Sequence, residues 1–244
     1  MSPEMKIYHR LFFQEVSNEK FLRILENPVR AYEDEMPDCP IIDIGCGQSS
    51  TLLDYLEAKR DLVAVDNEQS QLNYLRKRVE NYNPEKLAHW TFLCKSLPDE
   101  TIFERDYALV ILSHLLHFFS LNECIEIGKL IAEKTKSGAL IYSRVHSTKH
   151  YGNHPEDPNN YDYFKHYFSV EDLDAVFPNE KFEKIYSAEV ESQTMALERK
   201  IQIKWIEEVC RKAKITDRRE ITEIKREHFK DQKESFIDTI YRRL

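Results

Sequence analysis

The segment that most constrains the fold is residues 40–50, P-I-I-D-I-G-C-G-Q-S-S. Its β-branched run, residues 41–44, is typical of a strand that is buried on both faces of a parallel sheet. The run stops at Gly45-Cys46-Gly47, where two of the chain's five glycines indicate a sharp turn or a close approach to another group. Leucines at helical spacing follow in residues 52–56. The segment therefore predicts a strand, a tight glycine turn and a helix.

Length and composition predict one globular domain with at most a small appendage. The 244 residues are 41% hydrophobic, which is ordinary for a chain with a sizeable core. The formal net charge of -8 argues against tight, non-specific binding to nucleic acid, because that binding needs clustered Lys and Arg. Five widely spaced cysteines form no C-x-x-C pair, which indicates reduced thiols and no zinc site. We therefore expect no bound metal.

The chain shows no signal for export or for membrane insertion. Its first ten residues have neither a continuous apolar stretch nor a small-residue cleavage site. No apolar run of 18 residues occurs anywhere in the sequence. We therefore expect a cytoplasmic protein that does not bind a membrane.

Strands and helices alternate after the glycine turn. The second apolar run ends at Asp66-Asn67, and a helical face follows in residues 72–79. Ser120 and Glu123 have the spacing of a capping box that opens a later helix. This alternation predicts a parallel sheet covered on both faces. The first five predicted strands are residues 41–44, 61–65, 90–94, 107–112 and 139–145.

A long loop separates this alternating part from the rest of the chain. Residues 146–168 show no regular pattern and are rich in His, Tyr and Phe, which favours a functional segment over a disordered one. A capping box, Ser169 to Asp172, then opens a short helix. Two more strands are predicted, residues 181–188 and 197–205, the second from its alternation of Ile and Trp with Lys and Gln.

Both ends of the chain are predicted to be helical. Residues 6–27 carry apolar side chains at helical spacing with a break near Ser17, so we expect two short helices before the first strand. An apolar stripe in residues 236–244 predicts an amphipathic helix. We therefore divide the chain into a domain that includes the N-terminal helices, residues 1–206, and a charged helical extension packed on it, residues 207–244.

The acids near the glycine turn indicate which ligand the fold binds. Asp66 ends the second strand 19 residues after Gly47, where a carboxylate can accept hydrogen bonds from both hydroxyls of a ribose. A dinucleotide site has a third glycine where this chain has Ser50, and the carboxylate of Asp43 would repel a pyrophosphate. The G-K-[ST] of a P-loop is absent. A positively charged nucleoside cofactor, S-adenosylmethionine, fits these residues best.

Four segments together resemble the class I S-adenosylmethionine-dependent methyltransferases. They are I-I-D-I-G-C-G, V-A-V-D-N-E, D-Y-A-L-V-I-L-S-H-L-L-H-F-F and K-S-G-A-L-I-Y-S, and the resemblance covers residues 35–205. It implies an α/β fold: a Rossmann-like, doubly wound, mostly parallel sheet of seven strands in the order 3-2-1-4-5-7-6, with helices on both faces. It also implies methyl transfer from S-adenosylmethionine.

The resemblance assigns cofactor-binding residues by position. Asp43, Gly45, Cys46 and Gly47 would hold the methionyl part, Asp66 the ribose hydroxyls and Asn67 the adenine edge. Ser113 and His114 would lie beside the transferred methyl group. The family often has an acid after the third strand that meets the adenine amino group. Here the sequence is Cys94-Lys95-Ser96, so Ser96 or a backbone carbonyl would replace that contact.

Candidate catalytic residues follow the fourth strand and lie in the long loop. Methyl transfer mainly requires positioning of the acceptor and exclusion of water, and a base is needed only if the acceptor is protonated. The candidates for an acceptor pocket or base are His114, His117, His146 and Tyr161. Each histidine alone also fits a hydrogen-bonded or surface imidazole, and the aromatic loop also fits ordinary packing.

These patterns predict a methyltransferase for a small-molecule acceptor that an aromatic and His-rich lid encloses. After the fourth strand the chain has Ser113-His114-Leu115-Leu116 in place of the N-P-P-[YF] of enzymes that methylate amino groups of nucleic-acid bases. A nucleic-acid acceptor is therefore disfavoured. Two alternatives stay open: a non-catalytic S-adenosylmethionine-binding or partner subunit, and a nicotinamide-dependent oxidoreductase.

Overall fold

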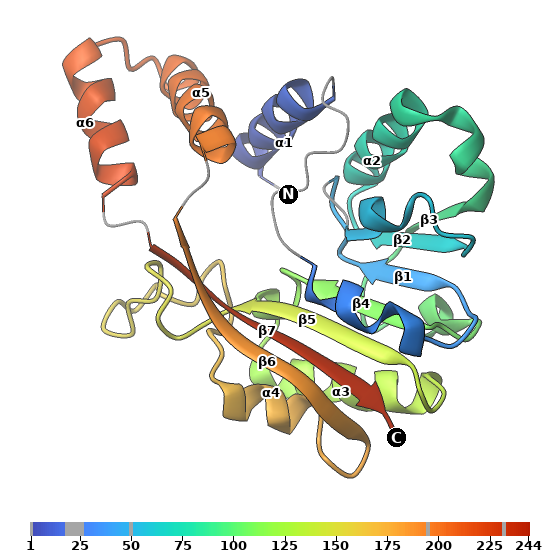
Figure 1. The fold of residues 1–244 in the computed structure, drawn as a ribbon. Coiled ribbons are helices and arrows are strands. Elements are labelled where there is room, and N and C mark those ends of the chain that lie inside the picture. Colours follow the sequence, from blue (N-terminus) through green and yellow to red (C-terminus); the bar gives the residue numbers. More distant parts are fainter. Residues whose placement is uncertain (1, 18–26, 49–50, 194–195, 231–232) are drawn as a thin grey trace.

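The computed structural model describes residues 2–17, 27–48, 51–193, 196–230 and 233–244. Seven strands form one sheet in the order β3-β2-β1-β4-β5-β7-β6, and β7 runs antiparallel to both of its neighbours (Figure 1). This order and the mostly parallel sheet are as expected. The strands are β1 (Ile41–Ile44), β2 (Leu62–Asp66), β3 (Trp90–Cys94), β4 (Leu109–Ser113), β5 (Leu140–His146), β6 (Phe182–Gln193) and β7 (Lys233–Arg243).

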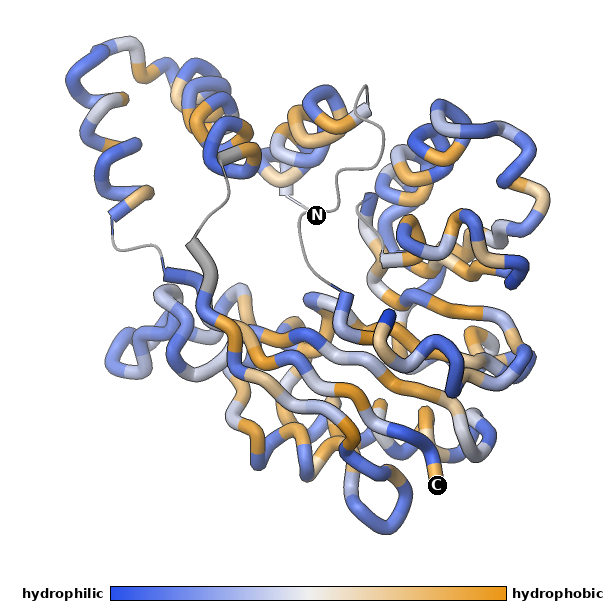
Figure 2. Tube along the Cα trace, in the orientation of Figure 1, coloured by the Kyte–Doolittle hydropathy of each residue, from blue (hydrophilic) through white to orange (hydrophobic). Residues whose placement is uncertain are grey.

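Helices cover both faces of the sheet. Two apolar clusters result, one between the sheet and α3 with α4, and one on the opposite face that includes residues of α2. Figure 2 shows the apolar residues concentrated along the strands, whereas α6 and the outer loops are mostly hydrophilic. The helices are α1 (Pro3–Val16), α2 (Gln69–Tyr82), α3 (Leu121–Lys134), α4 (Val170–Val176), α5 (Ala196–Lys212) and α6 (Arg218–His228).

Local capping signals are confirmed. Ser120 and Glu123 form both hydrogen bonds of a capping box at the start of α3, and Ser169 and Asp172 do so at the start of α4. Gly138 follows α3 with a φ of 89°, a left-handed conformation that favours glycine. The helix after the glycine turn is shorter than expected, a 3-10 helix at Thr51–Tyr55. Of the two N-terminal helices, α1 is confirmed and the second lies outside the described residues.

Two predictions for the last fifty residues are wrong. Residues 197–205 belong to helix α5, because this Leu-, Glu-, Lys- and Arg-rich segment favours a helix and buries Ile201 against Ile7 and Leu11 of α1. Residues 236–243 belong to β7, the strand between β5 and β6. The expected division after residue 206 therefore falls inside α5, and a strand of the sheet follows it.

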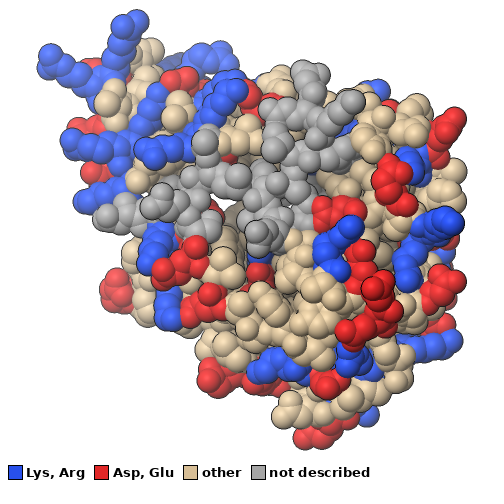
Figure 3. Space-filling view, viewed as in Figure 1, with Lys and Arg blue, Asp and Glu red and all other residues tan. Residues whose placement is uncertain are grey.

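The helices α5 and α6 are inserted between β6 and β7, and α5 packs on α1. Figure 1 shows the three helices on one side of the sheet. Residues 196–230 hold eleven Lys and Arg against seven Asp and Glu, and blue atoms accordingly gather over α5 and α6 in Figure 3. Within the described residues, none of the helices has the length and apolar character needed to cross a bilayer.

Candidate functional site

The glycine turn after β1 is fixed to the neighbouring strand and open on one side. Gly45 and Gly47 have φ values of 72° and 54°, which glycine adopts without strain. The amides of Gly45 and Cys46 both donate to the carbonyl of Val65, at 2.8 and 3.0 Å. An added Cβ at Gly45 would lie 2.7 Å from Leu115 Cδ1, whereas one at Gly47 would meet nothing within 4 Å. The turn thus leaves room for a ligand at Gly47.

Asp66 joins the end of β2 to this turn. One carboxylate oxygen accepts from the amide of Gly47 at 2.9 Å, and the other accepts from the amide of Glu68 at 2.8 Å. Burial raises the pKa of Asp66, although these two amide bonds act against the rise. The sequence placed Asp66 opposite the turn, and the structure brings the two into contact.

The other proposed cofactor-binding residues fall into two groups. Asp43 is buried and accepts from the amide of Thr51 at 3.0 Å, so it also fixes the start of the 3-10 helix. Cys46 is buried, and its burial raises the pKa of the thiol well above the usual value, which keeps it protonated. Asn67 and Ser96 are exposed and follow the adjacent strands β2 and β3. These two side chains therefore remain accessible to a ligand at that edge.

The end of β4 has an unusual backbone. Ser113 is half-buried beside Arg144 of β5, and His114 has a φ of 56°. A non-glycine residue in this left-handed region is uncommon and often marks a functional position. The amide of His114 donates to the carbonyl of Arg144 at 2.8 Å, which ties the turn to β5.

Four histidines, His114, His117, His146 and His150, gather at the ends of β4 and β5 and are called the histidine cluster below. The rings of His117 and His150 each lie 4.1 Å from the ring of His146, nearly parallel to it. The ring of His114 lies 6.0 Å from that of His146, edge to face. Phe164 packs edge-on against His146 at 4.5 Å. The loop and two strand ends thus build one aromatic wall.

Burial keeps these imidazoles neutral. It lowers the pKa of His114 to about 3 and of His150 to about 4, and it also lowers the pKa of His117 and His146. His117 and His146 are 1% and 8% exposed, and the Nδ1 atom of each is buried without a hydrogen-bond partner among the described residues. A buried polar atom of this kind is costly unless a ligand or water satisfies it.

Of the four candidate catalytic residues, three come together and one lies further out. His114, His117 and His146 share the histidine cluster. Tyr161 is 45% exposed, and its ring lies 6.4 Å from that of Tyr167, which in turn lies 6.3 Å from His146. Tyr161 therefore stands at the outer rim of the aromatic wall.

The structure adds residues that the sequence reasoning missed. Arg144 forms a buried two-point ion pair with Asp238 of β7, at 2.5 Å for both contacts, and its guanidinium lies over Phe236. Phe236 also contacts His114 at 5.0 Å between ring centres. Arg144 and Asp238 are each a charged residue inside an otherwise apolar run, and this was the signal in the sequence that could have revealed them. In the part of the chain that the structure describes, no three His, Cys, Asp or Glu side chains come together in a group that could hold a metal ion.

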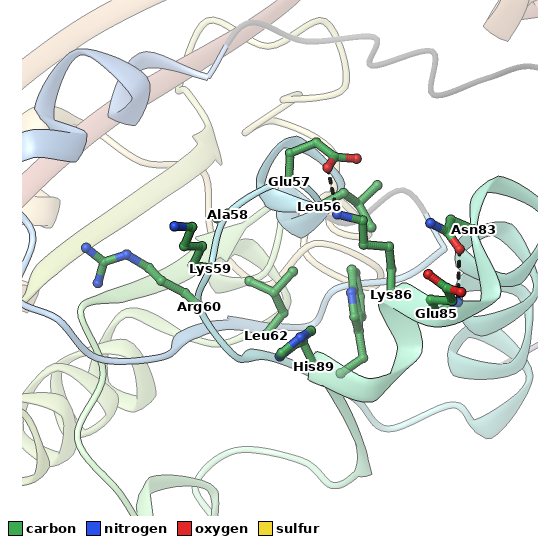
Figure 4. A pocket seen from close by; sticks show the side chains of 11 residues that line it. Leu56, Glu57, Ala58, Lys59, Arg60, Leu62, Asn83, Glu85, Lys86 and His89 are labelled. Carbon is green, nitrogen blue, oxygen red and sulfur yellow. Dashed lines mark hydrogen bonds and ion pairs between the residues drawn. The ribbon is translucent and has the colours of Figure 1, made fainter.

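A separate cavity of about 400 Å³ lies near the start of β2 and β3 (Figure 4). Its Lys86 forms an ion pair with Glu57 at 2.6 Å, so that charge is already balanced within the cavity. Leu62 and Trp90, which also line it, are the first residues of their strands. The glycine turn and the histidine cluster instead lie at the carboxyl ends of the strands, so this cavity is not part of the candidate site.

Comparisons with known proteins identify the class. Residues 41–138 match a family model described as a methyltransferase domain. No curated protein matches the sequence. The chain is similar in structure to the mycolic acid cyclopropane synthase CmaA1 complexed with S-adenosylhomocysteine (SAH) and CTAB, at 12% identity and a TM-score of 0.61, covering 99% of both chains.

Two further solved structures are similar over most of their length. Coclaurine N-methyltransferase, bound to N-methylheliamine and SAH, has 13% identity and a TM-score of 0.60, covering 98% of this chain and 86% of that one. A putative sarcosine dimethylglycine methyltransferase from Galdieria sulphuraria has 11% identity and a TM-score of 0.61, covering 96% and 97%. At these identities the likeness shows the fold.

Residues 41–138 match a methyltransferase domain, and the sheet has the strand order expected of the S-adenosylmethionine-dependent methyltransferase fold. S-adenosylmethionine is its cofactor. The site fits that molecule: the turn is open at Gly47, and the carboxylate of Asp66 faces the turn from the next strand.

Proposed function

We propose that the chain transfers a methyl group from S-adenosylmethionine to a small-molecule acceptor that the loop after β5 encloses. The observation that carries this proposal is the aromatic wall of the histidine cluster at the end of β4, one strand away from the glycine turn. It combines packed aromatic rings with polar atoms that have no hydrogen-bond partner among the described residues, and small-molecule sites likewise combine apolar and polar groups. Coclaurine N-methyltransferase, which has the same fold, holds the small molecule N-methylheliamine.

The loop is tied down at both strand ends, which supports its role as a lid. The amide of Lys165 donates to the carbonyl of His117 at 2.8 Å, and that of Phe168 to the carbonyl of His146 at 2.9 Å. The hydroxyl of Tyr167 donates to the carbonyl of Gly152 at 2.8 Å and so closes the loop on itself. We infer that residues 147–168 cover the acceptor and exclude water from it.

The proposed roles follow from position. Asp66 and Asn67 would hold the ribose and adenine parts of the cofactor, and the turn at Gly45 and Gly47 the methionyl part, with Ser96 near the adenine. When bound, S-adenosylmethionine supplies an activated methyl group for in-line displacement. The protein's part is to hold the acceptor in line and to keep water out.

The histidine cluster is suited to hydrogen bonding and poorly suited to storing a proton. A pKa of about 3 leaves His114 neutral at pH 7, so it can accept a hydrogen bond from an acceptor hydroxyl or amine. His117 and His146 each have a buried Nδ1 atom without a hydrogen-bond partner among the described residues. We infer that these three residues orient the acceptor and that Tyr161 closes its outer rim.

We propose the cytoplasm as the location and no nucleic-acid partner. All five cysteines are free thiols, which suits a reducing compartment. The net charge of -8 disfavours a phosphate backbone. The basic excess of α5 and α6 is partly neutralised from α1, since Lys200 and Lys204 both pair with Glu15.

The test separates catalysis from binding. The protein is first titrated with SAH by calorimetry, and it is then incubated with methyl-labelled cofactor and a cell metabolite extract. We expect SAH binding and label in a small organic product. Binding without label in any product supports the non-catalytic alternative. Binding of a nicotinamide dinucleotide in place of SAH supports an oxidoreductase, and label in nucleic acid contradicts the proposed acceptor class.

A further inference from the structure

Four polar side chains meet next to the glycine turn and are called the turn cluster below. They are His9 of α1, Gln48, which follows Gly47, and Gln71 and Arg78 of α2. Gln48, Gln71 and Arg78 are each 5% exposed. Long polar side chains are seldom buried this far unless they have partners, so their hydrogen bonds are informative.

Hydrogen bonds join the four residues to one another. Nη1 of Arg78 donates to the carbonyl of Gln48 at 2.6 Å, and Nε2 of Gln48 donates to the carbonyl of His9 at 2.8 Å. Nε2 of Gln71 contacts Nδ1 of His9. Burial lowers the pKa of His9, so its neutral ring can accept this hydrogen bond. Helix α1, which Figure 1 shows beside α2, therefore closes the turn cluster on one side.

Two acceptor atoms of the turn cluster are left over. Gln48 and Gln71 both use their amide nitrogen on His9, and Oε1 of each is buried without a hydrogen-bond partner among the described residues. Such an atom is costly, and in a native protein it indicates a ligand or an ordered water. An ammonium group has three N–H donors and could satisfy both oxygens.

The guanidinium of Arg78 has no acid to balance its charge. Among the described residues, the buried Lys and Arg side chains are those of Arg144 and Arg78. Arg144 pairs with Asp238, whereas Arg78 forms no ion pair within that part of the chain. Burial lowers the pKa of Arg78 to about 10, which leaves the group charged at pH 7. A buried guanidinium of this kind is suited to a carboxylate, which it can bind at two points.

The acids on the other side of the turn determine how a zwitterion would be oriented. Asp43 accepts from the amide of Thr51, and Asp66 accepts from the amide of Gly47. Both carboxylates would repel the carboxylate of a ligand. The space at Gly47 is open, and the guanidinium of Arg78 is bonded to the next residue. A ligand carboxylate at the turn is therefore more stable toward Arg78 than toward the two acids.

We propose that the turn cluster holds the amino-acid end of S-adenosylmethionine, with Arg78 on its carboxylate and the amide oxygens of Gln48 and Gln71 on its ammonium group. The inference rests on the proposed function, which places the methionyl part at the turn just before Gln48. It adds Gln48, Gln71 and Arg78 to the residues that bind the cofactor. His9 positions the two glutamine amides so that their oxygens stay available.

The experiment compares three ligands by calorimetry at pH 7.5. They are SAH, decarboxylated SAH, which keeps the ammonium group alone, and 5′-methylthioadenosine, which has the nucleoside and the thioether but no amino-acid end. We expect the wild type to bind SAH about ten-fold or more tightly than 5′-methylthioadenosine. Equal affinities would overturn the inference. A wild type that binds neither SAH nor 5′-methylthioadenosine refutes the proposed function, and this inference with it.

Variants of α2 assign the two charges. Arg78→Met should weaken SAH about ten-fold or more and change the other two ligands by less than about two-fold, and Arg78→Lys should recover part of the loss. Gln71→Leu should weaken both SAH and decarboxylated SAH, but not 5′-methylthioadenosine. The control is Lys77→Met, which removes an exposed charge of the same helix that pairs with Glu80, and it should leave all three affinities unchanged.

Two results with these variants contradict the inference while the proposed function stands. An equal loss of SAH and 5′-methylthioadenosine in Arg78→Met means that the turn cluster only supports the fold of the turn. Unchanged SAH affinity in both Arg78→Met and Gln71→Leu means that the cluster holds an internal water. If Arg78→Met does not fold, the same comparison with Arg78→Lys and Gln71→Leu decides.

Discussion

Acidification should destabilise the folded chain through the histidine cluster. Burial lowers the pKa of His114 to about 3 and of His150 to about 4, and His117 and His146 are lowered in the same way. In the unfolded chain each imidazole takes up a proton near pH 6.5, as model peptides do. Below that pH the unfolded state therefore binds more protons than the folded state. The stabilisation is complete above pH 6.5 and is lost as the pH falls toward the folded pKa values.

The size of the effect follows from proton linkage. Between pH 7.5 and 5.5, each histidine that stays neutral in the folded state costs about 1.4 kcal/mol, or about 5.5 kcal/mol for four. Glu234 acts in the opposite direction, because its pKa of about 7 lets the folded state hold an extra proton in this range. That gain is about 2 kcal/mol. The net loss of about 3.5 kcal/mol is a large part of the stability of a typical domain.

Urea unfolding followed by circular dichroism at pH 7.5, 6.5 and 5.5 measures this loss. His150→Asn should reduce this loss of stability by about 1.4 kcal/mol, since only three histidines then take up a proton in the unfolded state but not in the folded state. His89→Asn is the control, because His89 is exposed at the start of β3, and its pH dependence should match the wild type. A wild-type stability that stays constant or rises down to pH 5.5 would refute the reasoning, as would cluster imidazoles that titrate near pH 6.5 by NMR.

Three substitutions test the turn and the packing. Asp66→Ala should weaken SAH binding by about 1.5 to 3 kcal/mol in calorimetry, the cost of losing charged hydrogen bonds, whereas the exposed Asp61→Ala should not; unchanged affinity would remove the ribose assignment. Gly45→Ala should cost about 1–3 kcal/mol of stability in urea unfolding, because its Cβ meets Leu115 Cδ1 at 2.7 Å and its φ is 72°, and Leu115→Ala should recover part of that cost in the double variant. Gly128→Ala should destabilise by about 1–3 kcal/mol despite the better helix propensity, since its Cβ would lie 2.0 Å from a backbone carbonyl of α4; a neutral or higher melting temperature would contradict this.

The arrangement of the proposed cofactor site could be predicted because its residues are close in sequence or lie at adjacent strand ends. Parallel strands bring their carboxyl ends to one edge, so a buried run ending in Asp66 had to face the turn after residues 41–44. The hydrogen bond from the amide of Gly47 to Asp66 confirms that Asp66 lies beside this turn. The second hydrogen bond of Asp66, from the amide of Glu68, depends on the local backbone conformation, which the sequence did not predict.

The last strand could not be predicted from its pattern. β7 is covered on both faces, and its buried residues therefore do not alternate with exposed ones. Phe236, Ile237, Ile240 and Tyr241 recur at one and four residues, which is also the spacing of a helical face. The alternation in residues 197–205 wrongly indicated a strand, because Ile201 faces α1 from a helix in which Lys200, Gln202 and Lys204 happen to fall on every second position. Periodicity alone cannot distinguish these cases without knowledge of the partner surfaces.

The proposed acceptor site depends on contacts between segments that the sequence does not relate. His146, His150 and Phe236 all lie outside residues 41–138, the part that matches the methyltransferase family model. His146 contacts Phe236 of β7, and α5, which with α6 is inserted between β6 and β7, packs on α1 through Ile201, Ile7 and Leu11. We infer that the shared domain sets the cofactor, whereas the inserted helices and β7 set the acceptor. If so, exchanging α5 and α6 for those of a relative should change which acceptor binds and leave SAH affinity unchanged.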